Sequence, residues 1–399
     1  MNSMKKKDML ARKQMHILWI NKITDKEYWR TTQLELTKSL KKRGNQVTLV
    51  MAKNIGENKT KEDDIIYLPT VPNHLFSGLI FGLVLLFYFP LMIRKKKIDI
   101  IMIDVTSIWL PFTITLKLLS NVPIVTDIRD FAEKNKNVVS NISFFLIKYI
   151  ADGITTITPQ LKEILVKKYH LNDKNIEIWS SGVSIDIFNK KYQDININNE
   201  GYSKKFVLLH HGSYGPGRGI ENLILALNKL NNDLKKRVKL ILIGILPKDQ
   251  ERFLRLCEEA NVKDRVDILP IKSHEKIPFY IQISNVGIIP LNPEYISYQV
   301  SVPLKTLEYM AMGKPIIATN IPFHQRIFEK GECGILINAN TPEVLANAIT
   351  EMYENKDKME TMGKIGKKII LEQYTWDKVA FTVEKIIKNI LQGYYNEKQ

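Results

Sequence analysis

Short apolar runs rich in β-branched residues alternate with longer amphipathic runs along the whole chain. This alternation is typical of βα units, in which the strands form a parallel sheet and the helices cover its faces. In the first half, the pattern predicts strands at 15–20, 46–51, 65–68, 98–104, 123–127, 153–157 and 176–179, and helices at 27–43, 108–119 and 159–169.

A polar stretch at 189–205, with few large apolar residues, is interpreted as a linker between two domains. A second series of strands follows at 206–210, 238–244, 266–269, 286–290, 315–318 and 333–337, and helices at 355–373 and 376–392 close the chain. The fold class expected is therefore α/β, with two doubly wound, Rossmann-like domains facing across a cleft. Their expected bounds are 1–195 and 203–375, with a C-terminal helix at 376–399 returning to the N-terminal domain.

The composition agrees with two globular domains and limits the classes of partner that the protein could bind. The chain has 399 residues, of which 45% are apolar and 25% charged, so it can build ordinary cores. Its net charge of +16 indicates a polyanionic partner, which could be nucleic acid, anionic lipid or a phosphorylated small molecule. Cys257 and Cys333 have no paired spacing, which disfavours a disulfide framework and a cysteine-based zinc site. A basic N-terminus without the apolar core of a signal peptide predicts a cytoplasmic protein.

The stretch VPLKTLEYMAMGKPIIAT (302–319) carries the most chemistry. It predicts a helix from about Leu304 to Met312, with Pro303 in its first turn and Gly313 at its end. The positive end of such a helix suits a pyrophosphate, and Lys305 adds a cation there. Glu308, one turn further, can accept two hydrogen bonds from a diol such as a ribose. A solvent-exposed ion pair is the simpler interpretation of an isolated K-x-x-E.

A second stretch, HHGSYGPGRGIENL (210–223), leads from a strand through four glycines to Arg218 and a helix from about Ile220. Glycines allow backbone to approach a ligand, and Arg218 can bind phosphate oxygens in a fork. The spacing is not that of the G-x-G-x-x-G dinucleotide fingerprint, and a plain glycine-rich turn is an equally good interpretation.

Several stretches in this order resemble the family 4 retaining glycosyltransferases of GT-B architecture. They are ADGITTITPQLKEILVKKY (151–169), IWSSGVSIDIFN (178–189), KLILIGILPKDQERFL (239–254), the 302–319 stretch, CGILI (333–337) and YTWDKVA (374–380). Together they extend over nearly all of the chain. The likeness is to the bacterial or archaeal type that builds surface glycans.

The resemblance implies a nucleotide-sugar donor bound by the C-terminal domain, an acceptor bound by the N-terminal domain, and transfer with retention. It implies no metal or other cofactor, in agreement with the lack of a convincing D-x-D motif. Carried over by position, it places Gly212, Ser213 and Arg218 at the diphosphate, Leu304, Lys305 and Thr306 beside the phosphates, Glu308 at the ribose, and Leu269, Pro270 and Ile271 beside the base.

The chain also departs from the family pattern. Val300 stands where the family has a glutamate that contacts the donor sugar, and Ser213 replaces a common arginine, which leaves Arg218 as the main cation of that loop. In VTDIRDF (125–131), Arg129 occupies a position where histidine is common, so Arg129 or Asp130 is expected to contact the donor sugar or the acceptor hydroxyl. Asp130 as a helix cap is an equally good interpretation. The first loop, within 20–29, lacks the family's glycine pair.

The segment HLFSGLIFGLVLLFYFPLMIRKKK (74–97) is apolar over nineteen residues, 75–93, nearly enough to span a bilayer. Spanning would separate the strands at 65–68 and 98–104, which belong to one sheet. We expect instead a helix in the lipid interface, with Arg94 to Lys97 on anionic headgroups. An ordinary core helix is the alternative.

These observations favour a membrane-peripheral glycosyltransferase on the inner face of the cell membrane, acting on a lipid-linked or cell-surface glycan. Its expected catalytic residues are Arg129, Asp130, Arg218 and Lys305. A sugar-nucleotide epimerase of the same architecture and a basic nucleic-acid-binding protein remain alternatives, although no nucleic-acid-binding motif is found. None of the seven histidines has metal-binding spacing.

Overall fold

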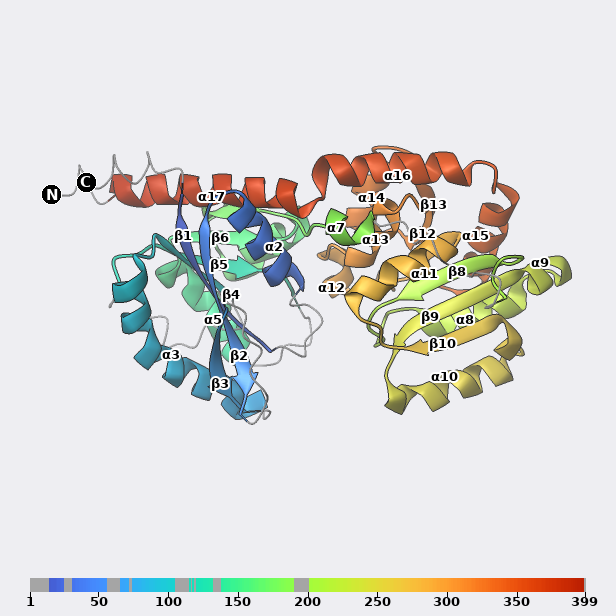
Figure 1. The fold of residues 1–399 in the computed structure, drawn as a ribbon, viewed down its shortest axis with the longest axis horizontal. Helices are drawn as coiled ribbons and strands as arrows, with labels where there is room; N and C mark the ends of the chain where they lie inside the picture. The colour runs from blue at the N-terminus through green and yellow to red at the C-terminus, as the bar shows by residue number, and fades with distance from the viewer. Residues whose placement is uncertain are drawn as a thin grey trace. The chain divides into compact units, whose positions relative to one another are not determined.

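The chain folds into two compact units in the computed structural model, which describes residues 14–24, 31–55, 65–71, 74–104, 115, 117, 120–131, 138–189 and 201–397 (Figure 1). Unit 1 combines residues 1–181 with 376–399, and unit 2 comprises residues 182–375. The second unit thus begins before residue 195, the expected end of the first domain, because Val183 already forms a β-bridge with Thr375 inside unit 2. Most of the expected linker at 189–205 and most of the helix expected at 108–119 lie outside the described residues.

The sheet of unit 1 contains each of the seven strands that the hydrophobic pattern predicted, all parallel, in the order β3-β2-β1-β4-β5-β6-β7. The strands are β1 (His16–Thr24), β2 (Gln46–Asn54), β3 (Ile65–Thr70), β4 (Ile100–Asp104), β5 (Ile124–Ile128), β6 (Gly153–Thr156) and β7 (Ile176–Ile178). The chain reverses its direction across the sheet between β1 and β4, where ligands of such sheets bind. The loops directly after these two strands lie outside the described residues.

Five helices described in unit 1 are α2 (Thr31–Lys42), α3 (His74–Lys96), α5 (Val138–Ile150), α6 (Pro159–Tyr169) and α17 (Trp376–Glu397). Helix α6 begins where the side chain of Thr158 accepts a hydrogen bond from the amide of Leu161, with Pro159 as the first helical residue. The C-terminal helix α17 packs beside α2, and its residues Val379 and Val383 share a core with Trp19 of β1 (Figure 1).

Helix α3 connects two strands of one parallel sheet and carries two apolar stripes. The stripe of Phe81, Leu85 and Phe89 is buried against the sheet. The other stripe is exposed, with Phe87 at 80% of its possible exposure, and consists of Phe76, Leu79, Leu83, Phe87, Tyr88 and Leu91. The two stripes explain why apolar residues run all round this helix in the sequence.

The sheet of unit 2 is also parallel and has the order β10-β9-β8-β11-β12-β13. Its strands are β8 (Phe206–His211), β9 (Val238–Ile245), β10 (Val266–Pro270), β11 (Val286–Ile289), β12 (Ile316–Thr319) and β13 (Gly334–Ile337), which confirms the second series of predicted strands. From β8 the chain moves outward to β9 and β10, and then returns to β11 on the other side of β8. The switch point of this sheet therefore lies between β8 and β11.

The helices described in unit 2 are α7 (Ile185–Phe188), α8 (Ile220–Lys229), α9 (Asn232–Arg237), α10 (Pro247–Glu259), α11 (Ile277–Ile283), α12 (Ile296–Gln299), α13 (Leu304–Ala311), α14 (Pro322–Phe328), α15 (Pro342–Glu354) and α16 (Met359–Gln373). The helix expected at 355–373 begins only at Met359, because α15 ends at Glu354 and a short turn follows.

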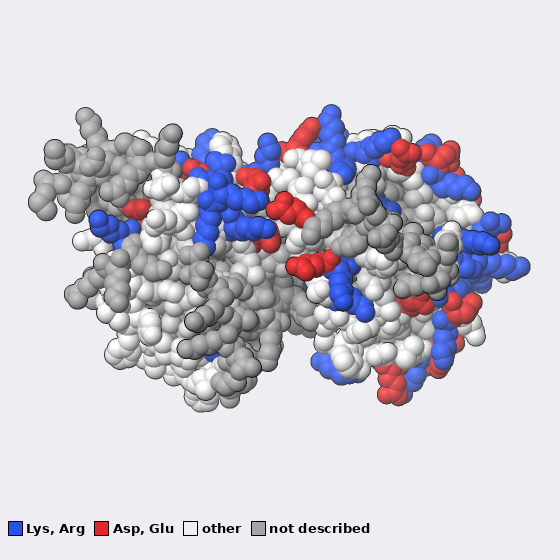
Figure 2. Space-filling view, in the orientation of Figure 1, with Lys and Arg blue, Asp and Glu red and all other residues white. Residues whose placement is uncertain are grey.

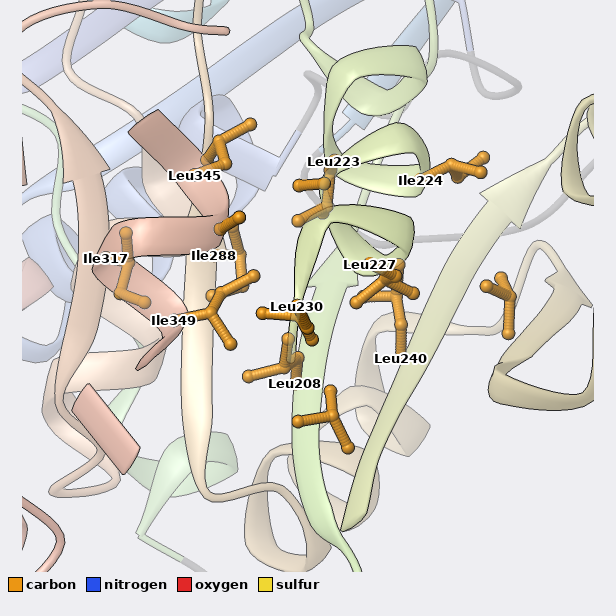
Figure 3. Packing of buried hydrophobic residues seen from close by; sticks show 14 of the residues in the cluster. Leu208, Leu223, Ile224, Leu227, Leu230, Leu240, Ile288, Ile317, Leu345 and Ile349 are labelled. Carbon is orange, nitrogen blue, oxygen red and sulfur yellow. The ribbon is translucent and has the colours of Figure 1, made fainter. Parts of the chain in front are cut away.

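A continuous apolar core lies between the unit 2 sheet and helices α8 and α15. Figure 3 shows Leu230, at the end of α8, near Leu208 of β8, Leu227 of α8 near Leu240 of β9, and Ile349 of α15 near Ile288 of β11. This packing supports the strands whose carboxyl ends form the candidate site, since β8 and β11 are both central in the sheet.

Candidate active site

The loops after β8 and β11 bring the predicted donor-binding residues together at the switch point of unit 2. The loop after β8 begins with Gly212 and Ser213, and the segment after β11 leads into α13, which starts at Leu304. Helix α13 ends at Ala311, and Gly313 follows with a positive φ of 70°, as the sequence predicted for its C-terminal end.

Lys305 and Glu308 are not the exposed ion pair that an isolated K-x-x-E suggests. Their exposed fractions are 8% and 6%, and each contacts a histidine. Burying two charged side chains is costly unless polar groups compensate. Their burial at the switch point is therefore characteristic of a functional site rather than of a solvated helix face.

The amine of Lys305 lies 3.1 Å from Nε2 of His210, the penultimate residue of β8. On the other side of the ring, Nδ1 of His210 lies 2.9 Å from the carbonyl oxygen of Ile288. A carbonyl only accepts, so Nδ1 carries the hydrogen and Nε2 accepts from Lys305. Burial lowers the pKa of His210 well below its usual value, which keeps the ring neutral. Burial, reinforced by the nearby charge of Arg218, also holds the pKa of Lys305 well below its usual value.

Thr306 has a similar arrangement with His324. Nδ1 of His324 lies 2.6 Å from the carbonyl oxygen of Thr319, so Nδ1 carries the hydrogen. The hydroxyl of Thr306 therefore donates to Nε2, at 2.9 Å. Burial lowers the pKa of His324 to about 4, so the ring is neutral at pH 7.

The carboxylate of Glu308 lies between two histidines from different loops. Its Oε1 is 2.8 Å from Nε2 of His274, which follows β10 in a short turn at His274–Lys276. Its Oε2 is 3.3 Å from Nε2 of His211. Burial, the largest single influence, would raise the pKa of Glu308, but the hydrogen bond from His274 and the electrostatic interactions with His211, His274 and Lys305 together exceed it and leave this pKa below its usual value. Burial lowers the pKa of His211 to about 4.

The glycine loop after β8 approaches the amine of Lys305. Gly212 has φ of 109°, a conformation that favours glycine, and a Cβ placed on it would be in van der Waals contact with Nζ of Lys305 at 3.4 Å. Ser213 is exposed. Arg218, at the end of the same loop, lies over the ring of Tyr298 with its Cζ 5.2 Å from the ring centroid.

The remaining positions carried over to unit 2 lie at the same end of the sheet. Leu269 and Pro270 end β10 and Ile271 follows; Leu269 and Ile271 are partly buried, and Pro270 is exposed. Val300 follows α12 and is 1% exposed, so its side chain belongs to the core.

In unit 1, Arg129 follows β5 at the carboxyl edge of the sheet. Its guanidinium stacks on Trp179, 3.6 Å from the ring centroid, and Nη2 donates to the hydroxyl of Ser181 at 3.1 Å. Asp127, two residues earlier, accepts from the hydroxyl of Thr155 at 2.7 Å. Burial raises the pKa of Asp127 to about 6 even though the positive charge of Arg129 opposes the shift.

Asp130 is exposed, and its Oδ1 accepts a hydrogen bond from the amide of Phe131 at 2.7 Å. The next helix that the structure describes, α5, begins only at Val138. Within the described ranges, no group of three or more His, Cys, Asp or Glu side chains is arranged to hold a metal ion.

Two family models match the chain, one after the other. The model described as glycosyltransferase family 4 matches residues 31–187, and the model described as glycosyl transferases group 1 matches residues 193–369. The chain is a family 4 glycosyltransferase. This membership confirms the resemblance of the motifs to the family 4 glycosyltransferases and decides against the epimerase and nucleic-acid-binding alternatives.

Relatives and solved structures of this glycosyltransferase agree with its fold. An uncharacterised glycosyltransferase of Methanocaldococcus jannaschii is 26% identical over 268 residues, which cover 65% of this chain and 66% of that protein. Two further curated relatives are each matched over 60% of their own length. The chain therefore spans less than two thirds of the length of these curated relatives.

The sucrose-phosphate synthase of Thermosynechococcus elongatus superposes with a TM-score of 0.77 at 18% identity, over 95% of this chain and all of that one. The Anabaena protein HepE in complex with UDP superposes with a TM-score of 0.73 at 15% identity, over 94% of this chain and all of that one. Both confirm the GT-B fold of two Rossmann-like domains.

Sequence reasoning found the helix of this glycosyltransferase that holds Lys305, Thr306 and Glu308, but it missed the histidines that contact them. The spacing of the histidines argues only against a metal site and does not indicate that His210, His211 and His274 contact this helix or its residues. A usable signal existed, because His210 and His211 end a central strand and His274 follows the end of β10, so all three lie at the ligand-binding edge.

Proposed function

We propose that this glycosyltransferase moves a sugar from a nucleoside-diphosphate sugar to a lipid-linked or cell-surface glycan acceptor, with retention of anomeric configuration. The observation that carries the proposal is the burial of Lys305 and Glu308 on one helix at the switch point of unit 2. A cation and a carboxylate three residues apart fit the two ends of a nucleoside diphosphate, its phosphates and its ribose. The UDP bound by HepE, a protein of the same fold, supports this donor class.

In this proposal unit 2 binds the donor. The bound diphosphate favours the protonated form of Lys305 and so opposes the lowering of its pKa by burial. Lys305 and Arg218 then stabilise the diphosphate as it leaves, the electrostatic contribution that is usually largest in such sites. Gly212, Ser213, Leu304 and Thr306 lie beside the phosphates, Glu308 accepts from the ribose hydroxyls, and Leu269, Pro270 and Ile271 flank the base. Arg129 and Asp130 of unit 1 contact the donor sugar or the acceptor hydroxyl, and the transfer needs no metal.

The donor proposal is tested by thermal shift with a panel of UDP-, GDP- and ADP-sugars. A donor at 100 times its Kd adds about 2.7 kcal/mol of stability. Glu308→Ala should weaken binding of the selected donor by about 1.5–3 kcal/mol, the range for a hydrogen bond to a charged group. Glu343→Ala, an exposed glutamate of the same unit, is the matched control. No stabilisation by any donor, or unchanged binding in Glu308→Ala, would contradict the proposal.

The proposed acceptor is presented at a membrane, and the support is the exposed apolar stripe of α3. Helix α3 contains an 18-residue window, Phe76–Ile93, long and apolar enough to cross a bilayer, with a mean hydropathy of 2.3. Yet α3 joins β3 to β4 of one parallel sheet and packs on that sheet. If α3 spanned the membrane, β3 and β4 would lie on opposite sides of it and could not belong to the same sheet. Lying in the lipid interface covers the exposed stripe and leaves the sheet intact.

Helix α5 offers a second exposed apolar surface through Ile142, Phe145 and Tyr149. Right-handed crossovers from β3 to β4 and from β5 to β6 place α3 and α5 on the same face of the unit 1 sheet. Lys148 lies 3.9 Å from the centroid of the Phe145 ring, as in an amphipathic interfacial helix. In Figure 2 the described residues drawn at the lower left, where Figure 1 draws α3, are almost all uncharged.

The basic run at 94–97 follows this stripe directly and would meet anionic headgroups at the cytoplasmic face of the membrane. Each such charge contributes on the order of 1 kcal/mol near an anionic surface. In flotation with anionic liposomes, the protein should bind at low salt and lose part of its binding at high salt. Replacing Lys95, Lys96 and Lys97 with Gln should weaken flotation, and Phe87→Ser should weaken it at all salt concentrations. Leu371→Ser, an exposed leucine of unit 2, is the control. A wild-type protein that never floats would show that this stripe does not bind lipid.

A further inference from the structure

His274 and Glu308 come from two different segments of unit 2. Glu308 lies on α13, which follows β11, whereas His274 belongs to the turn after the edge strand β10. Their contact, 2.8 Å from Nε2 to Oε1, joins the segment proposed to flank the base to the carboxylate proposed to hold the ribose. The base and the ribose of one nucleoside would therefore contact two segments, the one after β10 and helix α13, that are already hydrogen-bonded to each other.

The direction of this hydrogen bond follows from the ionisation of Glu308. An ionised carboxylate only accepts, so Nε2 of His274 carries the hydrogen. The imidazole is also supported from a second side, because it packs edge-on against Phe188 with 5.0 Å between ring centroids and 63° between ring planes. Phe188 is fully buried in α7, so it gives the imidazole a rigid neighbour.

The other carboxylate oxygen faces a different environment. Oε2 of Glu308 lies 3.3 Å from Nε2 of His211, a ring that is itself buried at the end of β8. With Oε1 bonded to His274 and Oε2 next to His211, rotation of the carboxylate would break the first contact. The orientation in which Glu308 can accept from two neighbouring hydroxyls is thus set before any ligand arrives.

We propose that His274 is a positioning residue that holds the Glu308 carboxylate in the orientation that accepts the hydrogen bonds of the nucleotide ribose. The inference rests on the proposed function, since it assigns a second residue to the same donor site. His274 acts through Glu308 and need not touch the donor itself. Loss of the imidazole frees the carboxylate to turn away, and the resulting loss of affinity is confined to ligands that carry ribose hydroxyls.

The test measures the Kd of UDP, GDP and ADP by titration calorimetry, and then compares the tightest of the three with its 2′,3′-dideoxy analogue. For the nucleotide with both hydroxyls, His274→Ala should raise Kd roughly 10-fold, which corresponds to about 1.4 kcal/mol. For the dideoxy analogue, wild type and His274→Ala should bind equally. His274→Gln, whose side-chain amide can donate to Oε1, should recover most of the affinity. Lys276→Ala, exposed in the same turn, should change neither ligand.

A double variant separates positioning from a general effect on the fold. If His274 acts through Glu308, His274→Ala should weaken binding no further in a Glu308→Ala background. Equal weakening for both nucleotides, additive losses in the double variant, or failure of His274→Gln to recover affinity in a protein of wild-type melting temperature would overturn the inference. A wild-type protein that binds none of the three nucleotides would instead overturn the proposed donor site and the inference with it.

Discussion

The amine of Lys305 donates to Nε2 of His210, at 3.1 Å, inside the core of unit 2. A lysine buried against a neutral acceptor differs from the usual surface lysine, because burial lowers its pKa and the hydrogen bond to the ring fixes its position. The amine lies beside Gly212, whose positive φ of 109° favours glycine at this position.

Lys305→Ala should slow turnover more than it weakens donor binding. The negative charge of the leaving diphosphate grows in the transition state, so a cation there contributes more to kcat than to KM. The loss of kcat should be roughly 10²–10³-fold, as for removal of one group that stabilises a developing anion. Lys248→Ala, an exposed lysine of the same unit, should leave both constants unchanged. A Lys305→Ala enzyme with wild-type kcat would contradict the role.

The buried histidines should make unit 2 sensitive to acid. Burial lowers the pKa of His324 to about 4 from 6.5, so the unfolded chain takes up a proton first as pH falls. Stability is therefore fully present above about pH 6.5 and is lost as pH falls toward 4, by on the order of 3 kcal/mol for this residue.

His324→Gln cannot titrate, so its melting temperature should fall less than that of the wild type between pH 7 and pH 4.5. Differential scanning fluorimetry at several pH values measures this. His170→Gln, at an exposed position of unit 1, should follow the wild type. Parallel curves for the wild type and His324→Gln would show that the ring is not neutral in the fold.

Gly287→Ala should displace helix α13, which carries Lys305 and Glu308. A Cβ on Gly287, in β11, would lie 2.3 Å from Cδ2 of Tyr309, whose hydroxyl donates to the carbonyl of Leu209 at 3.0 Å. Tyr309 lies on α13 next to Glu308, so the methyl group must shift the helix that carries the site. Overpacking of this kind costs about 1–3 kcal/mol. Donor binding should weaken together with the melting temperature, whereas Gly215→Ala, with open space around it, should alter neither stability nor fold.

The strands of both units could be predicted because each is a short apolar run bounded by turn residues, and parallel sheets bury such runs on both faces. The helix of Lys305 and Glu308 could be predicted for a similar reason, since Pro303 and Gly313 mark its two ends. The contacts of His210, His274 and His324 could not, because they join positions 18 to 95 residues apart that meet only when β8, β10, β11 and β12 are ordered in the sheet.

Helix α3 shows a different limit. Its sequence is apolar on every side, and the residues alone do not distinguish a core helix from an interfacial one. Only the folded structure shows which side of α3 faces the core: Phe81 and Leu85 are buried, whereas Phe87 and Leu91 are exposed.

Val300→Glu should change the preference among donor sugars. Val300 occupies the position at which family members have a glutamate, and its side chain is buried. A carboxylate there adds an acceptor for sugar hydroxyls but also costs stability, so the melting temperature should fall. Val300→Leu keeps the site apolar and should keep the wild-type preference. The measurement is the ratio of kcat/KM across a panel of donor sugars, and an unchanged ratio in Val300→Glu would count against the assignment.

The path of the chain, out of unit 1 and back into it, sets the order in which the two units can form during synthesis. Residues 182–375 are contiguous, so unit 2 has every strand and helix of its core as soon as α16 has emerged from the ribosome. Unit 1 must wait, although its strands are made first, because α17 supplies Trp376, Val379, Val383 and Ile387 to the core around Trp19. Until α17 has emerged as well, the face of the first sheet that carries α2 is only partly covered, and the unit whose strands are translated first is completed after unit 2.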